Sequence, residues 1–354
     1  MFRLSQFRAR RLPLETALAS VLVLTLGACA SVNPPDDHSP TPTPSPSVSM
    51  AHVDTSSIRS IIESPTDSPV LAVTGPAPSI ANEQAQEVSY TSGGKTVTGV
   101  VRTPKGKGPF PAVVVVHGAV DPAKYTSGGD LVATQRALLD AGYLVFAPDL
   151  RGYAGSDPAQ TAGNLNIDPG FGWSIILDWG MALDVVNALQ LLHTGAIDHV
   201  DTSRIGLLGH SMGGLLALDA AVIAPGSSNL VIALSAPASD FGELIGSLEA
   251  TKVNGLQELL DKVGTPSENP QYWADISPRS FFDRATEPLL LIHGGADTTT
   301  LPEWSKQTAE AWRATGNESQ AIIIAGADHH FASHLKELND TIVKAFDAVI
   351  GPGG

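Results

Sequence analysis

The sequence has 354 residues, of which 43% are hydrophobic and 16% are charged, and this suffices for one large hydrophobic core. Its formal net charge of −15 argues against nucleic acid and anionic membrane surfaces as partners, because both repel an acidic surface. Since Cys29 is the only cysteine, an internal disulfide is excluded and stability must come from the core.

The first 28 residues have the layout of a secretory signal. Four arginines precede the apolar run Ala17 to Leu26, which is shorter than a typical membrane-spanning helix. The run leads into Leu26-Gly27-Ala28-Cys29, which resembles the lipobox of bacterial lipoproteins, whose cysteine is acylated and becomes the mature N-terminus. We therefore predict a lipoprotein signal over residues 1–28 and lipidation at Cys29. An ordinary signal peptide and an uncleaved anchor are the alternatives.

All three interpretations place the rest of the chain outside the cytoplasm, and the lipoprotein interpretation anchors it in the cell envelope. Cleavage before Cys29 removes four arginines and Glu15, a net +3, so the formal charge falls from −15 to −18. We expect the membrane contact of such an acidic protein to come from its N-terminal lipid.

Residues 29–80 are predicted to form a disordered tether. Ser31 to Ser49 alternates proline with serine and threonine and contains few apolar residues, so it has little to bury. Residues 50–80 remain rich in proline, serine and threonine, with a short helix expected over Ile58 to Glu63. The globular domain is therefore expected over residues 81–351.

This domain begins with β-strand signals. Glu87 to Thr91 and Thr96 to Arg102 flank Ser92-Gly93-Gly94-Lys95, which predicts a β-hairpin with a tight glycine turn. The next apolar run, Ala112 to His117, reads AVVVVH and does not alternate with polar residues. Such a run is typical of a strand that is buried on both faces.

Strands and helices alternate over the remainder of the domain. The pattern predicts an α/β fold with a mostly parallel, twisted sheet and helices on both faces, which binds its ligand at the carboxyl ends of the strands. A short insertion over residues 236–286, before the strand that precedes the candidate acid, is a possible small cap. Helices are predicted over about 130–141, 173–193, 212–224, 302–315 and 332–350, and strands over about 143–148, 204–209, 230–235, 288–294 and 321–326.

A serine lies at one of the predicted strand-to-helix junctions. Gly209-His210-Ser211-Met212-Gly213 matches G-x-S-x-G at the place that a nucleophile elbow requires. Side chains at positions 209 and 213 would collide with neighbouring backbone in so tight a turn, so Gly209 and Gly213 are needed there. The alternative is a glycine-rich turn in which Ser211 merely caps the helix.

A serine hydroxyl needs a base to take its proton and an acid to hold that base. Asp297 and His329 each follow a later predicted strand, in the order Ser, Asp, His. We therefore predict that Ser211, Asp297 and His329 form a catalytic triad. His330 is the alternative base and Asp240 the alternative acid.

The turn His117-Gly118-Ala119 ends the first buried strand, where an oxyanion hole needs one of its donors. We predict that the backbone N–H groups of Ala119 and Met212 form this hole. Asp149 and Arg151, in the following loop, are interpreted as residues that hold the loops near the site.

His117, His210 and His293 each precede a glycine at a predicted strand end. Because they lie on separate strands without the close spacing of zinc ligands, we expect no metal or other cofactor. We interpret the three histidines as packing and hydrogen-bonding residues.

Residues 87–350 resemble the α/β-hydrolase superfamily, and within it the prolyl oligopeptidase catalytic domain and its dienelactone-hydrolase-like relatives. The resemblance implies an α/β-hydrolase catalytic domain over residues 81–351. Two departures weaken the match to the peptidase branch: Ala119-Val120 follow His-Gly where that branch has glycine and proline, and no β-propeller is expected. The matching phrases are FPAVVVVHGA, APDLRGYAGSD, GLLGHSMGG, the stretch Tyr272 to Pro302, and GADHHF.

These features favour an extracytoplasmic, lipid-anchored serine hydrolase that cleaves carboxylic esters through an acyl-Ser211 intermediate. A peptidase of the prolyl oligopeptidase type acting on short peptides is the alternative. A non-catalytic binding lipoprotein on a hydrolase scaffold is a second alternative. We expect the ligand to be a small ester or a short peptide and not a nucleic acid.

Overall fold

The computed structural model describes residues 53–159, 178–249 and 256–353. The predicted lipoprotein signal, Cys29 and the first part of the predicted tether lie outside the described residues, as do residues 173–177 of one predicted helix. Within the described ranges, no helix has the length and apolar character needed to cross a membrane.

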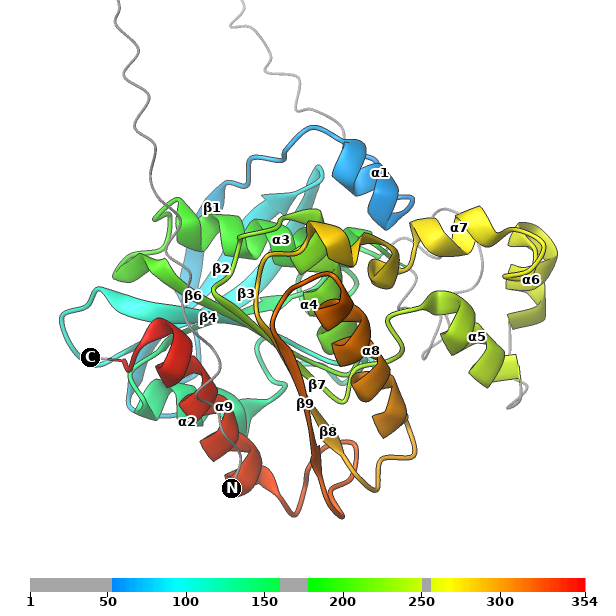
Figure 1. Cartoon of the computed structure of the whole chain (residues 1–354). Coiled ribbons are helices and arrows are strands. Elements are labelled where there is room, and N and C mark those ends of the chain that lie inside the picture. Colours follow the sequence, from blue (N-terminus) through cyan, green and yellow to red (C-terminus); the bar gives the residue numbers. More distant parts are fainter. Residues whose placement is uncertain (1–52, 160–177, 250–255, 354) are drawn as a thin grey trace, which may run out of the picture. The chain divides into compact units, whose positions relative to one another are not determined.

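In the described part of the chain, a nine-stranded sheet has the order β1-β2-β3-β5-β4-β6-β7-β8-β9 (Figure 1). The first three strands and the β3–β5 pair are antiparallel, and every pair from β5 to β9 is parallel. The predicted mostly parallel sheet is therefore confirmed. The strands are β1 (Leu71–Pro76), β2 (Glu83–Ser92), β3 (Lys95–Pro104), β4 (Phe110–Val116), β5 (Leu144–Asp149), β6 (Val200–His210), β7 (Leu230–Leu234), β8 (Leu289–Gly294) and β9 (Ser319–Ile324).

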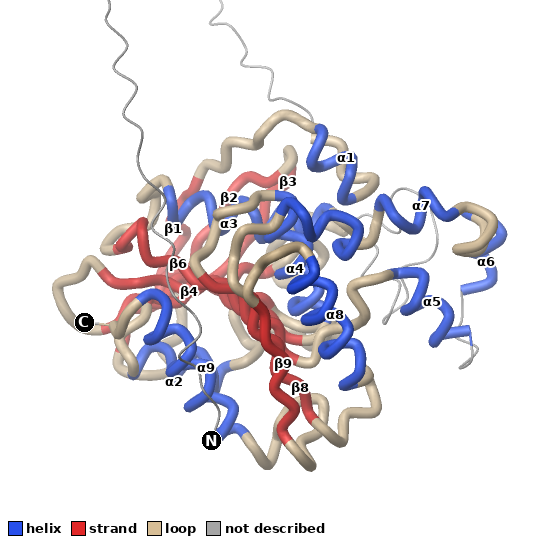
Figure 2. Tube along the Cα trace, in the orientation of Figure 1, coloured by secondary structure: helices blue, strands red, loops and turns tan. Residues whose placement is uncertain are grey.

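Helices cover both faces of the sheet, as Figure 2 shows. The helices α3, α4 and α8 lie over one face, and α2 and α9 lie over the other. The helices are α1 (Ile58–Glu63), α2 (Val132–Asp140), α3 (Gly180–His193), α4 (Met212–Ile223), α5 (Phe241–Glu249), α6 (Leu256–Val263), α7 (Pro270–Asp275), the 3-10 helix η4 (Pro278–Arg284), α8 (Pro302–Ala314) and α9 (Leu335–Ile350).

The central strand β4 shows why the sequence does not alternate between polar and apolar residues there. Ala112, Val114 and Val116 belong to the core beneath α3 and α4. Val113 and Val115 belong to the second core, beneath α2 and α9. Since each face of β4 is covered, every position of the strand must be apolar.

The predicted hairpin is formed by β2 and β3. Ser92 pairs with Lys95, so a two-residue turn connects the strands. Gly93 and Gly94 have φ of 56° and 79°, a left-handed conformation that favours glycine.

The domain begins earlier than the sequence suggested, because part of the expected tether is packed against the core. Val53, Ile58 and Ile61 are buried, the last two on one face of α1. Strand β1 extends the sheet by pairing with β2. The buried apolar residues of this segment are few, and they are easily overlooked in a stretch so rich in proline and serine.

The insertion between β7 and β8 is helical and contains α5, α6, α7 and η4. In Figure 1, α5, α6 and α7 project away from the sheet. An ion pair of 3.2 Å between Arg279 of η4 and Glu243 of α5 connects its two ends. A role of this segment as a small cap stays a prediction.

The docking of α1 yields a direct stability test. Replacing Ile58, which is fully buried, by alanine should lower the free energy of unfolding by about 2–4 kcal/mol, because it leaves a cavity. The exposed Val70, in the same stretch, is the control, and Val70→Ala should change stability by less than about 0.5 kcal/mol. Urea unfolding of both variants measures the difference, and equal effects would mean that residues 53–64 are not part of the domain.

Candidate active site

The serine sits in a strained turn between β6 and α4. Ser211 has φ of 54° and ψ of −120°, a conformation that non-glycine residues rarely adopt. A Cβ at Gly209 would lie 2.0 Å from the carbonyl oxygen of Gly213, and one at Gly213 would lie 2.4 Å from that of Val116. Both positions therefore require glycine, for the steric reason that the sequence suggested.

Three predicted side chains converge on this turn. His329 Nε2 lies 3.0 Å from Ser211 Oγ, and His329 Nδ1 lies 2.7 Å from Asp297 Oδ2. His329 comes from the loop after β9 and Asp297 from the loop after β8, so neighbouring strand ends bring the two together. The arrangement can pass a proton from the hydroxyl to the imidazole while the carboxylate holds the other ring nitrogen.

The two alternatives from the sequence lie elsewhere. The side chain of His330 is exposed, and its ring centroid lies 5.0 Å from that of His329. Asp240 accepts a hydrogen bond of 3.1 Å from the N–H of Glu243 at the start of α5. In the described structure, Asp240 therefore caps a helix of the insertion, while Asp297 contacts the imidazole.

Asp297 is buried yet held in its ionised form. Burial by itself would raise the pKa of its carboxyl group, but hydrogen bonds from His293, His329 and the backbone N–H groups of Thr300 and Thr299 outweigh this and lower the pKa. The two N–H groups lie 3.1 and 2.8 Å from Oδ1. The carboxylate is thus ready to stabilise a protonated imidazole at neutral pH.

The turn after β4 lies directly against the serine. A Cβ at Gly118 would be 3.4 Å from the Cβ of Ser211. The Gly118 oxygen lies 2.8 Å from His117 Nδ1, and the N–H of Leu150 donates to His117 Nε2 at 3.2 Å, so Nδ1 carries the ring hydrogen. Because C=O and N–H point in opposite directions across a trans peptide, the N–H of Ala119 is directed away from His117.

The second expected donor is the N–H of Met212, the first residue of α4. N–H groups in the first turn of a helix have no partner within the helix and favour negative charge. Ala119 follows the turn beside Ser211 and Met212 begins α4, and an oxyanion hole formed by their N–H groups stays a prediction.

The β4–α2 loop is fixed by Asp149, as expected from the sequence. This buried carboxylate accepts hydrogen bonds from the Tyr125 hydroxyl and the Gly128 N–H, both at 2.9 Å, and from the Ser127 hydroxyl. Arg151 forms a buried ion pair with Asp184 of α3 at 2.6 Å. Both residues support the loops around the site.

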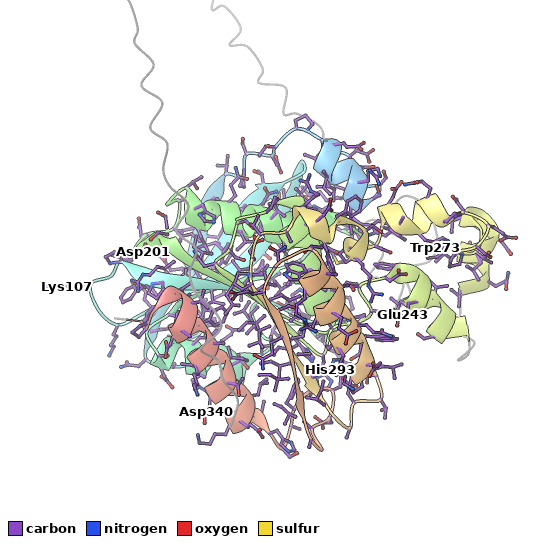
Figure 3. All side chains as sticks on the ribbon, viewed as in Figure 1. Lys107, Asp201, Glu243, Trp273, His293 and Asp340 are labelled. Carbon is purple, nitrogen blue, oxygen red and sulfur yellow. The ribbon has the colours of Figure 1, made fainter. Side chains whose placement is uncertain are left out.

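Two of the other histidines, His210 and His293, contact the residues of the site directly. His210 Nε2 lies 2.9 Å from the backbone oxygen of His329. His293, labelled in Figure 3, lies at the end of β8 with its Nε2 3.2 Å from Asp297 Oδ2. No cluster of three or more potential metal ligands occurs among the described residues.

Thr300 and Asp130 also contact the site, although no sequence pattern indicates a role for either residue. The Thr300 hydroxyl lies 2.9 Å from Asp297 Oδ2, and Asp130 Oδ2 accepts the Gly118 N–H at 2.8 Å. Thr300 is the last of three consecutive threonines after Asp297, but threonine is common in loops and only the fold shows which hydroxyl turns inward. Asp130 is twelve residues from Gly118, and the folded loop brings the two together.

Two family models match the chain. The model of the prolyl oligopeptidase family matches residues 174–347. The model of the dienelactone hydrolase family matches residues 97–234. Together they span the elbow, the acid and the base.

Individual proteins are also similar to this chain. Esterase EstD of Thermotoga maritima is 27% identical over 268 residues, which cover 68% of this chain and 59% of that protein, so the chain spans less than two thirds of that relative. The acetyl xylan esterase from Paenibacillus sp. R4 has a TM-score of 0.63 at 19% identity, covering 82% of this chain and 92% of that one. Acetyl Xylan Esterase 1 from Thermoanaerobacterium sp. JW/SL YS485 has a TM-score of 0.59 at 19% identity, covering 79% and 88%. These structural likenesses show a shared fold.

The buried His210 predicts how stability depends on pH. Burial lowers the pKa of His210 to about 4, so between its ordinary value of about 6.5 and pH 4 the unfolded chain binds a proton that the folded chain does not. His210 should therefore destabilise the fold as the pH falls through this window. When the pH is lowered from about 7.5 to about 5, the free energy of unfolding should fall by about 2 kcal/mol less in His210→Gln than in the wild type.

Urea unfolding of both proteins at the two pH values measures this difference. Glutamine keeps a donor for the His329 oxygen, and His193→Gln, at an exposed histidine, is the matched control. An equal loss of stability in wild type and His210→Gln would show that His210 does not titrate differently in the folded state.

Proposed function

Because the chain belongs to the α/β-hydrolase superfamily, we propose that it is a serine hydrolase that cleaves carboxylic esters through an acyl-Ser211 intermediate. The observation that carries this proposal is the continuous contact from Ser211 Oγ through His329 to Asp297, with distances of 3.0 and 2.7 Å. Such a series of hydrogen-bonded side chains activates a hydroxyl that would otherwise be a weak nucleophile.

The proposed reaction has two steps. Ser211 Oγ attacks the ester carbonyl while His329 Nε2 takes its proton and then returns it to the leaving alcohol. Water, deprotonated by His329, then attacks the acyl-Ser211 carbonyl and releases the acid. In both steps the N–H groups of Ala119 and Met212 would stabilise the tetrahedral oxyanion, and each such donor is typically worth about 3 kcal/mol.

Esters are favoured as substrates by the relatives and by one feature of the turn beside the serine. Esterase EstD and the two acetyl xylan esterases are esterases by name. Ala119-Val120 replaces the glycine and proline that the resemblance to the peptidase branch would imply at this turn. Small esters are therefore the substrates that we propose first.

A peptidase acting on short peptides is the second candidate. Its support is the prolyl oligopeptidase family model, whose match over residues 174–347 contains Ser211, Asp297 and His329. The two reactions share the same nucleophile and base. They differ in the leaving group, because an amine must be protonated by His329 as it leaves.

We further propose that the enzyme acts outside the cytoplasm, anchored by a lipid on Cys29. The support is the sequence Leu26-Gly27-Ala28-Cys29 after an apolar run and four arginines. The residues between Cys29 and Val53 would then separate the anchor from the catalytic domain.

A substrate panel tests the proposed activity. We expect short-chain p-nitrophenyl esters to be hydrolysed with a kcat/KM at least about 100-fold above that for prolyl and aminoacyl p-nitroanilides. Ser211→Ala should abolish both activities, and Asp297→Asn should lower kcat by about 10⁴-fold because the imidazole loses its partner.

Asp240→Asn is the matched control, since Asp240 also follows a strand of the sheet but caps α5. It should leave kcat within about twofold of wild type. A preference for the anilides would favour the peptidase, and a similar loss in Asp240→Asn and Asp297→Asn would contradict the assignment of the acid.

A further inference from the structure

The candidate acid, Asp297, touches two imidazoles. His329 Nδ1 lies 2.7 Å from its Oδ2, and His293 Nε2 lies 3.2 Å from the same oxygen. His293 is on β8, on the side of Asp297 that faces α8, where its Nδ1 lies 2.7 Å from the hydroxyl oxygen of Ser305. A serine–histidine pair therefore lies on each side of one carboxylate.

The oxygens around His293 fix its tautomer. Its Nε2 faces the Asp297 carboxylate and the Thr300 backbone oxygen, both at 3.2 Å, and neither of these can donate a hydrogen. Nε2 must therefore carry a hydrogen. In the neutral ring Nδ1 is then the acceptor, and the Ser305 hydroxyl donates to it.

This second pair is closed to substrate. His293 is fully buried, and Ser305 and Thr300 are almost fully buried. The Thr300 hydroxyl lies beside this contact, 3.2 Å from His293 Nε2 and 2.9 Å from Asp297 Oδ2. The pair can act only through Asp297.

We propose that His293, oriented by Ser305, is a positioning residue that holds Asp297 Oδ2 in the geometry His329 needs. The proposal rests on the proposed function, because it assigns a role in the activation of Ser211. The N–H groups of Thr299 and Thr300 hold Oδ1, and His293 Nε2, 3.2 Å from Oδ2 on the side away from His329, adds a further contact that limits rotation of that oxygen.

Loss of the His293 donor should shift the pH dependence of activity in one direction. A donor on Oδ2 withdraws negative charge from the carboxylate, so removing it strengthens the attraction between Asp297 and protonated His329. Protonated His329 cannot accept the proton of Ser211. The acid limb of the kcat/KM profile should therefore move to higher pH when the His293 donor is lost.

Other titratable groups face this site and stay constant in the comparison. His210 packs against the His329 ring from the end of β6, with centroids 4.9 Å apart, and His330 adjoins it in sequence. The Asp130 carboxylate, in the loop before α2, attracts the protonated ring of His210 and acts to raise its pKa. None of the test variants alters these groups.

The variants are His293→Leu, which removes the donor, and His293→Gln, whose amide can donate from near the position of Nε2. We expect His293→Leu to lower kcat about tenfold, with KM within about twofold of wild type. The acid limb should move up by about half a pH unit. In His293→Gln, kcat should return to within about threefold of wild type and the limb to its original position.

Ser305→Ala and His193→Leu complete the set. Ser305→Ala should lower kcat about two- to threefold, because His293 keeps its contact with Asp297 but loses its orientation. His193→Leu removes an exposed histidine at the end of α3, whose ring bonds the Ser227 backbone oxygen, and it should change neither kcat nor the profile. An unchanged acid limb in a folded His293→Leu would overturn the proposal, as would equal losses in the leucine and glutamine variants.

Two further measurements separate this proposal from the choice of substrate. The rate of Ser211 labelling by a fluorophosphonate, followed against pH, should show the same shift whether the natural substrate is an ester or a peptide. Nitrogen NMR of the histidine rings needs no activity at all. A hydrogen on His293 Nε2 and none on Nδ1 supports the assignment at neutral pH, and the opposite tautomer would contradict it even if wild-type protein hydrolysed esters.

Discussion

The ionised carboxylate of Asp297, buried beside His329, is the constraint on which the site depends. A buried carboxylate without partners would take up a proton, and a neutral acid could not stabilise a protonated imidazole. The loop after β8 turns two backbone N–H groups toward Oδ1, while His293 on β8 and His329 from the loop after β9 face Oδ2. The ionised state of Asp297 therefore depends on groups from two neighbouring strand ends, those of β8 and β9.

The sheet supplies the rest of the geometry. Strands β4, β6, β8 and β9 end at the same edge, so the turn at Gly118, the elbow at Ser211 and the loops that carry Asp297 and His329 meet there. This geometry requires a strained backbone at Ser211, which has a positive φ. The turn can form because Gly209 and Gly213 have no Cβ, which would collide with the neighbouring backbone. The buried strands beneath hold this turn in place.

Much of this was predictable because it depends on local signals. Buried parallel strands, the elbow glycines and the order Ser, Asp, His leave clear marks in the sequence, and the structure brings Ser211, Asp297 and His329 together. The docking of α1 and the roles of Thr300, Asp130 and His293 were not predictable in the same way. Each depends on a contact between segments that only the folded backbone brings together. The sequence alone does not show whether such a side chain packs inward or faces water.

Labelling of the folded protein, from residue 53 onward, with a fluorophosphonate is the most direct test that this site is an activated serine. Intact mass and peptide mapping identify the modified residue. We expect a single adduct on Ser211 that is lost in Ser211→Ala and forms far more slowly in His329→Ala. Well-folded wild-type protein that acquires no adduct, or an adduct that persists in Ser211→Ala, would contradict it and favour a binding protein on a hydrolase scaffold.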